Sequence, residues 1–172
     1  AEPSRLYAIA DLHVRYRKNV EFLVSLPRFS DDWLVVAGDV GETLEHMELA
    51  WRILKERFAG LIWVPGNHEL WTTPDDPHGL RGEAKYKGLV EVCRRYGVLT
   101  PEDPYRVWEE PGGPCVIAPL FLLYDYSFRP DFLGISDLFG EDRPPIVALT
   151  ATATHDSRKS IAEGLKLRED WT

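Results

Sequence analysis

The chain has 172 residues, of which 44% are hydrophobic and 28% are charged, and it contains six Trp, seven Tyr and seven Phe. This composition is typical of one folded domain with a buried core and excludes a disordered chain. The formal net charge of -8, without a long run of Lys and Arg, makes nucleic acid an unfavourable partner. Because no apolar stretch could cross a bilayer and the first residues lack a signal-peptide pattern, we expect a cytoplasmic protein without a membrane partner.

Three short apolar runs, each rich in β-branched or aromatic residues, predict buried strands. Each run stops at a turn-forming or polar residue, as strands do where the chain leaves a sheet. The runs span residues 6–10, 33–37 and 61–64.

Two longer segments between and after these runs predict amphipathic helices. Residues 43–58 carry apolar side chains at helical spacing, and Thr43 stands at the N-cap position. Residues 82–96 have the same periodicity, and Gly97 stands where a C-cap glycine is expected. Strands and helices thus alternate along this part of the chain.

The following part of the chain is richer in predicted strands. Residues 105–110 and 115–124 are separated by Pro-Gly-Gly-Pro, a connection that suits a hairpin with antiparallel pairing. We therefore expect an α/β fold, with a mixed β-sheet covered by helices, in a single domain over residues 1–172.

Polar side chains with metal-binding chemistry follow each of the first three predicted strands. Asp11 and His13 follow the first strand, and in an extended chain this spacing would point both to the same face. Asp39 follows the second strand, and Asn67 and His68 follow the third. Because ligands of open α/β sheets bind beyond the carboxyl ends of the strands, these groups are expected to converge.

The mixture of oxygen and nitrogen ligands suits manganese, iron or zinc better than calcium. Two such ions about 3.5–4 Å apart can activate water and stabilise the attacking and leaving oxygens of a phosphoester. Asp39 is the candidate for a carboxylate that bridges them. Each motif alone is common in turns for local reasons, but the three together favour two divalent metal ions as cofactors and a phosphoester as substrate.

The three motifs resemble the D-x-H, G-D and G-N-H-[ED] signatures of the calcineurin-like metallophosphoesterase family. They stand at residues 11–13, 38–39 and 66–69, and the resemblance covers roughly residues 4–130. It implies a metallophosphoesterase-like β-sheet sandwich that is flanked by helices, and a hydrolase activity.

The resemblance also implies roles for individual residues. Asp11 and His13 would bind one metal, Asp39 would bridge the two metals, and Asn67 would bind the second. His68 would protonate the leaving group or steady the transition state, so His68 and Asn67 are the expected catalytic residues.

The family completes its two metal sites with a later histidine and a Gly-His-x-His motif, and this sequence contains neither. After His68 the only histidines are His78, expected in a solvated or substrate-facing loop, and His155, a weak candidate for a replacement ligand. Two functions therefore stay open: a metal-dependent phosphoesterase impaired by its missing ligands, or a noncatalytic metal- or phosphate-binding module.

Other polar and aromatic residues have more ordinary interpretations. Trp71 and Arg81 would overhang the site, where they could contact substrate or form a structural lid. Asp75 and Asp76 are expected to be surface charge. The two cysteines, Cys93 and Cys115, have no metal-ligand spacing and are expected to be free thiols.

The C-terminal segment has a resemblance of its own. Residues 128–167 resemble the stretch of RecQ-like DNA helicases that ends in Ala-Leu-Thr-Ala-Thr-Ala, but no G-x-x-x-x-G-K-[ST] loop occurs, so ATP-driven activity is not expected. We expect residues 131–172 to form a strand and a helix packed on a metallophosphoesterase-like part, residues 1–130. The sandwich would then be incomplete at its C-terminus.

Overall fold

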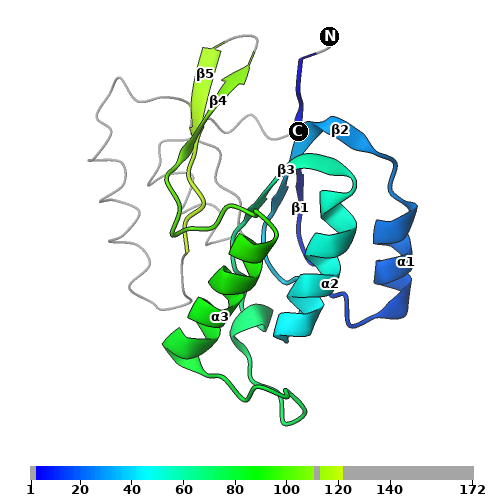
Figure 1. Ribbon diagram of the computed structural model, residues 1–172, viewed down its shortest axis with the longest axis vertical. Coiled ribbons are helices and arrows are strands. Elements are labelled where there is room, and N and C mark those ends of the chain that lie inside the picture. Colours follow the sequence, from blue (N-terminus) through cyan, green and yellow to red (C-terminus); the bar gives the residue numbers. More distant parts are fainter. Residues whose placement is uncertain (1–2, 111–112, 122–172) are drawn as a thin grey trace, which may run out of the picture.

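The structure is a computed structural model that describes residues 3–110 and 113–121 (Figure 1). Predictions for residues 122–172, which include the strand-helix tail and His155, lie outside the described residues and stay predictions. The division of the chain into parts before and after residue 130 is likewise a prediction.

A parallel sheet of three strands forms the centre of the described fold. Its order is β1-β2-β3, so strands that are consecutive in the chain are neighbours in space. The segment after the last helix continues the pairing, because Leu99 forms a parallel bridge with Ile62. The strands are β1 (Leu6–Ile9), β2 (Phe29–Val36) and β3 (Phe58–Trp63).

Helices connect these strands, as parallel pairing requires, and they lie together beside the sheet (Figure 1). Their apolar side chains and those of the sheet form one buried cluster, which includes Val36 and Trp63 from the sheet and Trp51 and Leu89 from the helices. The helices are α1 (Arg17–Ser25), α2 (Leu44–Lys55) and α3 (Gly82–Arg95), with a short 3-10 helix, η1 (His68–Leu70), after β3.

A hairpin of β4 (Arg106–Glu110) and β5 (Gly113–Ile117) forms a separate antiparallel sheet. Trp108 of β4 is buried, and its ring lies 6.2 Å from that of Trp33, centroid to centroid. Because side chains alternate along a strand, Trp33 lies on the face of β2 opposite to the helix-packed Leu34. The central sheet is therefore covered by helices on one face and contacted by the hairpin on the other.

The structure confirms the predicted α/β alternation and the hairpin. Thr43 caps α2 by accepting a hydrogen bond from the backbone N–H of His46 at 3.3 Å, and Gly97 follows α3 with a φ of 64°. Cys93 is a buried free thiol, and Cys115 is half-buried. Within the described ranges, no helix has the length and apolar character needed to cross a membrane.

Helix α1 was not predicted, because its sequence gives little signal. It has nine residues, and Tyr16 at its N-cap position makes no side-chain capping hydrogen bond. Only Leu23 is fully buried in it, so the apolar face is narrow. Packing on the sheet, rather than helix propensity, holds such a short helix in place.

Candidate metal centre

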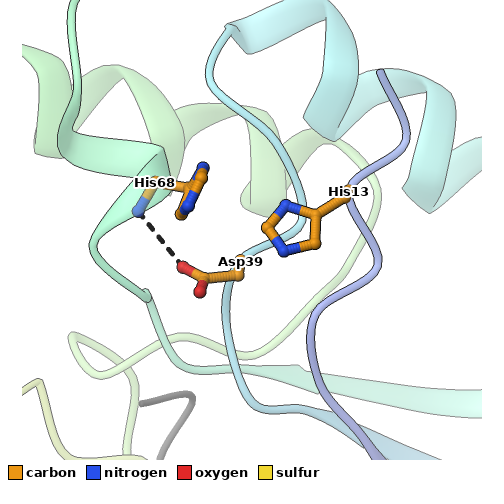
Figure 2. A group of neighbouring side chains, drawn as sticks. All are labelled: His13, Asp39 and His68. Carbon is orange, nitrogen blue, oxygen red and sulfur yellow. Dashed lines mark hydrogen bonds between the residues drawn. The ribbon is translucent and has the colours of Figure 1, made fainter. Parts of the chain in front are cut away.

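The loops that follow β1, β2 and β3 bring three metal-binding side chains together (Figure 2). His13, Asp39 and His68 each offer a ligand atom, and these atoms all lie within 4.8 Å of one another. The two imidazole rings are 4.7 Å apart, centroid to centroid, and stand at 75° to each other. The imidazole nitrogen of His13 and the carboxylate of Asp39 are ligands that suit a divalent transition-metal ion, and the imidazole of His68 lies beside them, so the residues fit the predicted cofactor.

Backbone hydrogen bonds carry the parallel pairing of β1 and β2 beyond the ends of the strands. The N–H of Asp11 donates to the carbonyl of Gly38 at 3.1 Å, and that of His13 donates to the carbonyl of Asp39 at 2.9 Å. The first two predicted motifs are thus fixed directly to each other.

Three site residues have the left-handed backbone conformation that non-glycine residues rarely adopt. Their φ angles are 57° for Asp11, 41° for His13 and 54° for Asp39. The prediction of an extended backbone at Asp11 and His13 is therefore wrong, because the loop turns at both residues. Backbone strain of this kind is typical of functional sites, where the surrounding hydrogen bonds maintain it.

Asp39 is the most buried member of the cluster, with 3% of its surface exposed. Its Oδ1 accepts a hydrogen bond from the backbone N–H of His68 at 3.1 Å, the dashed line in Figure 2. A Cβ atom at Gly66 would lie 2.1 Å from this same Oδ1. Residue 66 must therefore be a glycine, because the carboxylate of Asp39 occupies the space that a side chain at this position would need.

Glu69, fully buried beneath the cluster, holds the loops in position. Its Oε2 accepts the backbone N–H groups of Asp39 at 3.1 Å and Gly66 at 3.0 Å. Its Oε1 accepts the backbone N–H of Val40 at 3.0 Å and the indole N–H of Trp63 at 3.4 Å. One carboxylate thus binds the loop after β2 to the loop after β3.

The environment of Glu69 shifts its ionisation. Burial raises the pKa of Glu69 to about 7, against the opposing effect of the hydrogen bond from Val40, and the nearby charge of Asp39 raises it further. All four hydrogen-bond partners are donors, so the ionised carboxylate is the form that accepts every one of them. Glu69 belongs to the third motif, but the sequence did not indicate this role.

Glu42, which the sequence analysis did not single out, holds the ring of His68. Its Oε1 lies 3.1 Å from Nδ1 of His68, and its side chain is only 10% exposed. The second oxygen is buried without a hydrogen-bond partner in the described part of the chain. His46 does not fill that role, because its Nδ1 already accepts the backbone N–H of Glu42 at 3.2 Å. The interaction with Glu42 leaves Nε2 as the free ring nitrogen of His68.

The remaining predicted residues lie at the edge of the centre. Asp11 is exposed, and its Oδ1 lies 3.7 Å from Nε2 of His13. Asn67 is half-buried at the start of η1. Asp11 does not belong to the group whose ligand atoms lie within 4.8 Å of one another. His78 pairs with Glu45 at 2.8 Å and is likewise outside that group.

The loop over the centre, residues 71–81, is anchored by a buried ion pair. Its Asp76 contacts Nζ of Lys85 at 2.5 Å, and both side chains are 1% exposed, so the prediction of surface charge at Asp76 is wrong. Lys85 also donates to the carbonyl of Glu42 at 2.7 Å. In the same loop, the ring of Trp71 lies 3.9 Å from that of His68, which it partly covers.

Comparison with known protein families matches residues 4–167 to the family described as calcineurin-like phosphoesterase. The chain therefore belongs to the calcineurin-like phosphoesterase family, a family of metal-dependent hydrolases, as the three motifs predicted. The match extends beyond residue 130 and includes the segment 128–167, whose resemblance to helicases stays a prediction.

Two comparisons with individual proteins point to one relative from Mycobacterium tuberculosis. The [acyl-carrier-protein] phosphodiesterase PptH is 53% identical over 132 residues, which make up 76% of this chain and 40% of that protein. The crystal structure of phosphopantetheinyl hydrolase (PptH) is similar to this chain, with a TM-score of 0.69 and 39% sequence identity. The match covers 100% of this chain and 66% of that one. The chain thus spans less than two thirds of the length of these relatives.

Proposed function

We propose that the chain hydrolyses a phosphodiester with the help of divalent metal ions bound at the candidate centre. The observation that carries this proposal is the convergence of His13, Asp39 and His68 at one edge of the sheet. The similarity to PptH favours a phosphopantetheinyl group linked to an acyl carrier protein as the substrate. The finer substrate class rests on that relative alone.

The chain's residues divide between two proposed metal sites. Asp11 and His13 would hold one ion, and Asn67 would hold the second, with the buried Asp39 between them. When bound, the metal ions supply an activated water and positive charge near the phosphoryl oxygens. Manganese, iron and zinc all suit this ligand set.

His68 would act as the general acid. Glu42 would accept a hydrogen bond from Nδ1–H and fix the tautomer and the orientation of the ring, so a proton on Nε2 is the one available for transfer. In hydrolysis, the oxygen of water bonds to phosphorus and its proton is released to solvent, the bond to the leaving oxygen breaks, and that oxygen takes the proton from Nε2, which solvent then restores. The Trp71 ring restricts the access of water to one side of the imidazole.

A second candidate function is a noncatalytic metal- or phosphate-binding module. The observation that favours it is the absence of a Gly-His-x-His motif from the 172-residue sequence. Without those imidazoles, water would take the place of fixed ligands, and metal affinity would fall. Metal binding without turnover would identify this function.

The test uses acyl carrier protein that bears a phosphopantetheinyl group, incubated with the manganese-loaded chain and analysed by mass spectrometry. We expect loss of the phosphopantetheinyl mass, and we expect Asp39→Asn to abolish the reaction. Cleavage at equal rates by the wild type and the variant would contradict the assignment of this centre.

A further inference from the structure

A short basic segment borders the candidate centre. We call Arg15, Tyr16, Arg17 and Lys18 the basic rim; one residue, Val14, separates them from His13, and all four are exposed. The N–H of Tyr16 donates to the carbonyl of His13 at 3.0 Å, which closes a tight turn. Because a residue spans at most about 3.6 Å and Arg15 is two residues from His13, the rim begins within roughly 7 Å of the His13 backbone.

The basic rim is held rigidly on the fold. The side-chain amide of Asn19 donates to the carbonyls of Leu12 at 2.9 Å and His13 at 3.3 Å. Val14, within the turn, is buried, and its N–H donates to the carbonyl of Val40 at 2.9 Å. A partner that contacts the rim would therefore find it pre-organised and would lose little entropy in ordering it.

The charges of the rim are accessible. Lys18 has no ion-pair partner among the described residues, whereas Arg17 pairs with Glu21 at 2.7 Å while staying 91% exposed. Arg15 lies near the loop over the centre: the pKa of Asp75 is lowered, first by its hydrogen bond with Thr73 and to a smaller extent by the charge of Arg15. This is a local positive region in a chain of net charge -8.

Tyr16 gives the rim an aromatic contact. It is 62% exposed, the largest exposure among the large hydrophobic residues of the described chain. Tyrosine and arginine are both enriched in protein interfaces, where the tyrosine ring packs and its hydroxyl finds a hydrogen-bond partner. Three cations are fewer than the contacts that usually anchor a nucleic-acid backbone, so a protein is the better match.

We propose that the basic rim docks an acidic face of the carrier protein that delivers the phosphodiester to the centre. This inference rests on the proposed function. A substrate attached to a protein brings that protein's surface to within a short distance of the metal centre, and the rim is a positively charged part of the border there. Complementary charge would speed association and orient the partner.

The test measures binding of acyl carrier protein that lacks the phosphopantetheinyl group, and so cannot be cleaved, to the manganese-loaded chain by calorimetry, for wild type, Arg15→Glu and Lys18→Glu. The matched control is Arg28→Glu, an equal change of net charge at an exposed residue that precedes β2, on the opposite edge of the sheet. We expect Kd to rise about tenfold for each rim variant and not for the control, and the difference to shrink at about 0.5 M salt.

Hydrolysis of a small aryl phosphodiester serves as the second readout, and we expect it to be equal in all four proteins. Equal affinity of the rim variants and the control for the carrier protein would overturn the docking surface, even if the carrier protein is cleaved. Binding that depends on the rim without any cleavage would support the docking surface and contradict the proposed function.

Discussion

The carboxylate of Glu42 binds the imidazole of His68, with Oε1 of Glu42 3.1 Å from Nδ1 of His68. The two residues come from different loops, 26 positions apart in the chain. Their contact sets which ring nitrogen of His68 faces outward. Because this contact forms when the two loops fold, the fold itself fixes the orientation of His68, the proposed general acid.

Replacement of Glu42 tests this relationship. Glu42→Gln keeps the shape but replaces the carboxylate oxygen that contacts Nδ1 of His68 with an amide, which weakens the hold on the ring, so we expect kcat to fall by about 10- to 100-fold. The matched control is Glu45→Gln, because Glu45 forms a similar pair with His78 at 2.8 Å but lies outside the cluster. Steady-state rates on an aryl phosphodiester make the comparison, and equal losses in both variants would contradict the role of Glu42.

Glu69 is expected to determine metal affinity without touching the metal. Glu69→Gln would place an amide NH2 against N–H donors, because every hydrogen bond to this carboxylate is donated to it. We expect the free energy of unfolding to fall by about 1–3 kcal/mol. We expect the manganese affinity to fall by a larger fraction of its wild-type value than the free energy of unfolding does. Urea denaturation and metal titration of the same sample separate the two effects; unchanged manganese affinity would show that Glu69 is only structural.

Gly66→Ala tests the close approach of Asp39. The added Cβ would lie 2.1 Å from Oδ1 and 2.6 Å from the backbone nitrogen of Asp39, so the loop after β3 must shift. We expect the variant to lose metal binding and about 1–3 kcal/mol of stability. Gly79→Ala is the control, since its φ of 58° is strained for alanine but no atom lies within 4 Å of the added Cβ. Metal binding should survive in that control.

The buried Asp76–Lys85 pair predicts a loss of stability in acid. Burial alone would raise the pKa of Asp76, but the hydrogen bond and charge of Lys85 outweigh it, and the pKa is lowered. A lowered pKa in the folded state gives stability that is present above the unfolded value of about 3.9 and is lost as the pH falls through the folded value.

Urea denaturation between pH 7 and pH 2.5 tests this acid dependence. It gives the unfolding free energies of the wild type and of Asp76→Asn. We expect the variant to be less stable by about 3 kcal/mol at pH 7, because Lys85 keeps a buried charge, and to show a shallower fall in acid. The double variant Asp76→Leu with Lys85→Met should recover much of the loss. Parallel pH curves for wild type and Asp76→Asn would exclude the pair as the source of the acid dependence.

The sequence predicted the parts of the site that depend on strand order. Because parallel strands end at one edge of a sheet, His13, Asp39 and His68 were expected to meet, and the structure places them within 4.8 Å of one another. The roles of Glu42 and Glu69 depend instead on contacts between loops 26 to 30 positions apart. Such contacts leave no periodic pattern in a sequence.

The burial of Asp76 was missed for a similar reason. Two adjacent aspartates in a Pro-rich loop are usually solvated, and only the fold shows that Lys85, on a helix, reaches one of them. The left-handed backbone at Asp11 and His13 could not be predicted from the sequence either, because neither residue is the glycine that normally indicates such a conformation.

The measurement that tests the central claim most directly is a manganese titration of the purified chain, with Asp39→Asn as the control. We predict tight binding that is lost in the variant, because Asp39 is the buried carboxylate between the two imidazoles. Two ions per chain would support the proposed two-metal hydrolysis, and one ion would favour the noncatalytic module. Absence of binding, or equal binding by both proteins, would contradict the assignment of His13 and Asp39 to a metal centre.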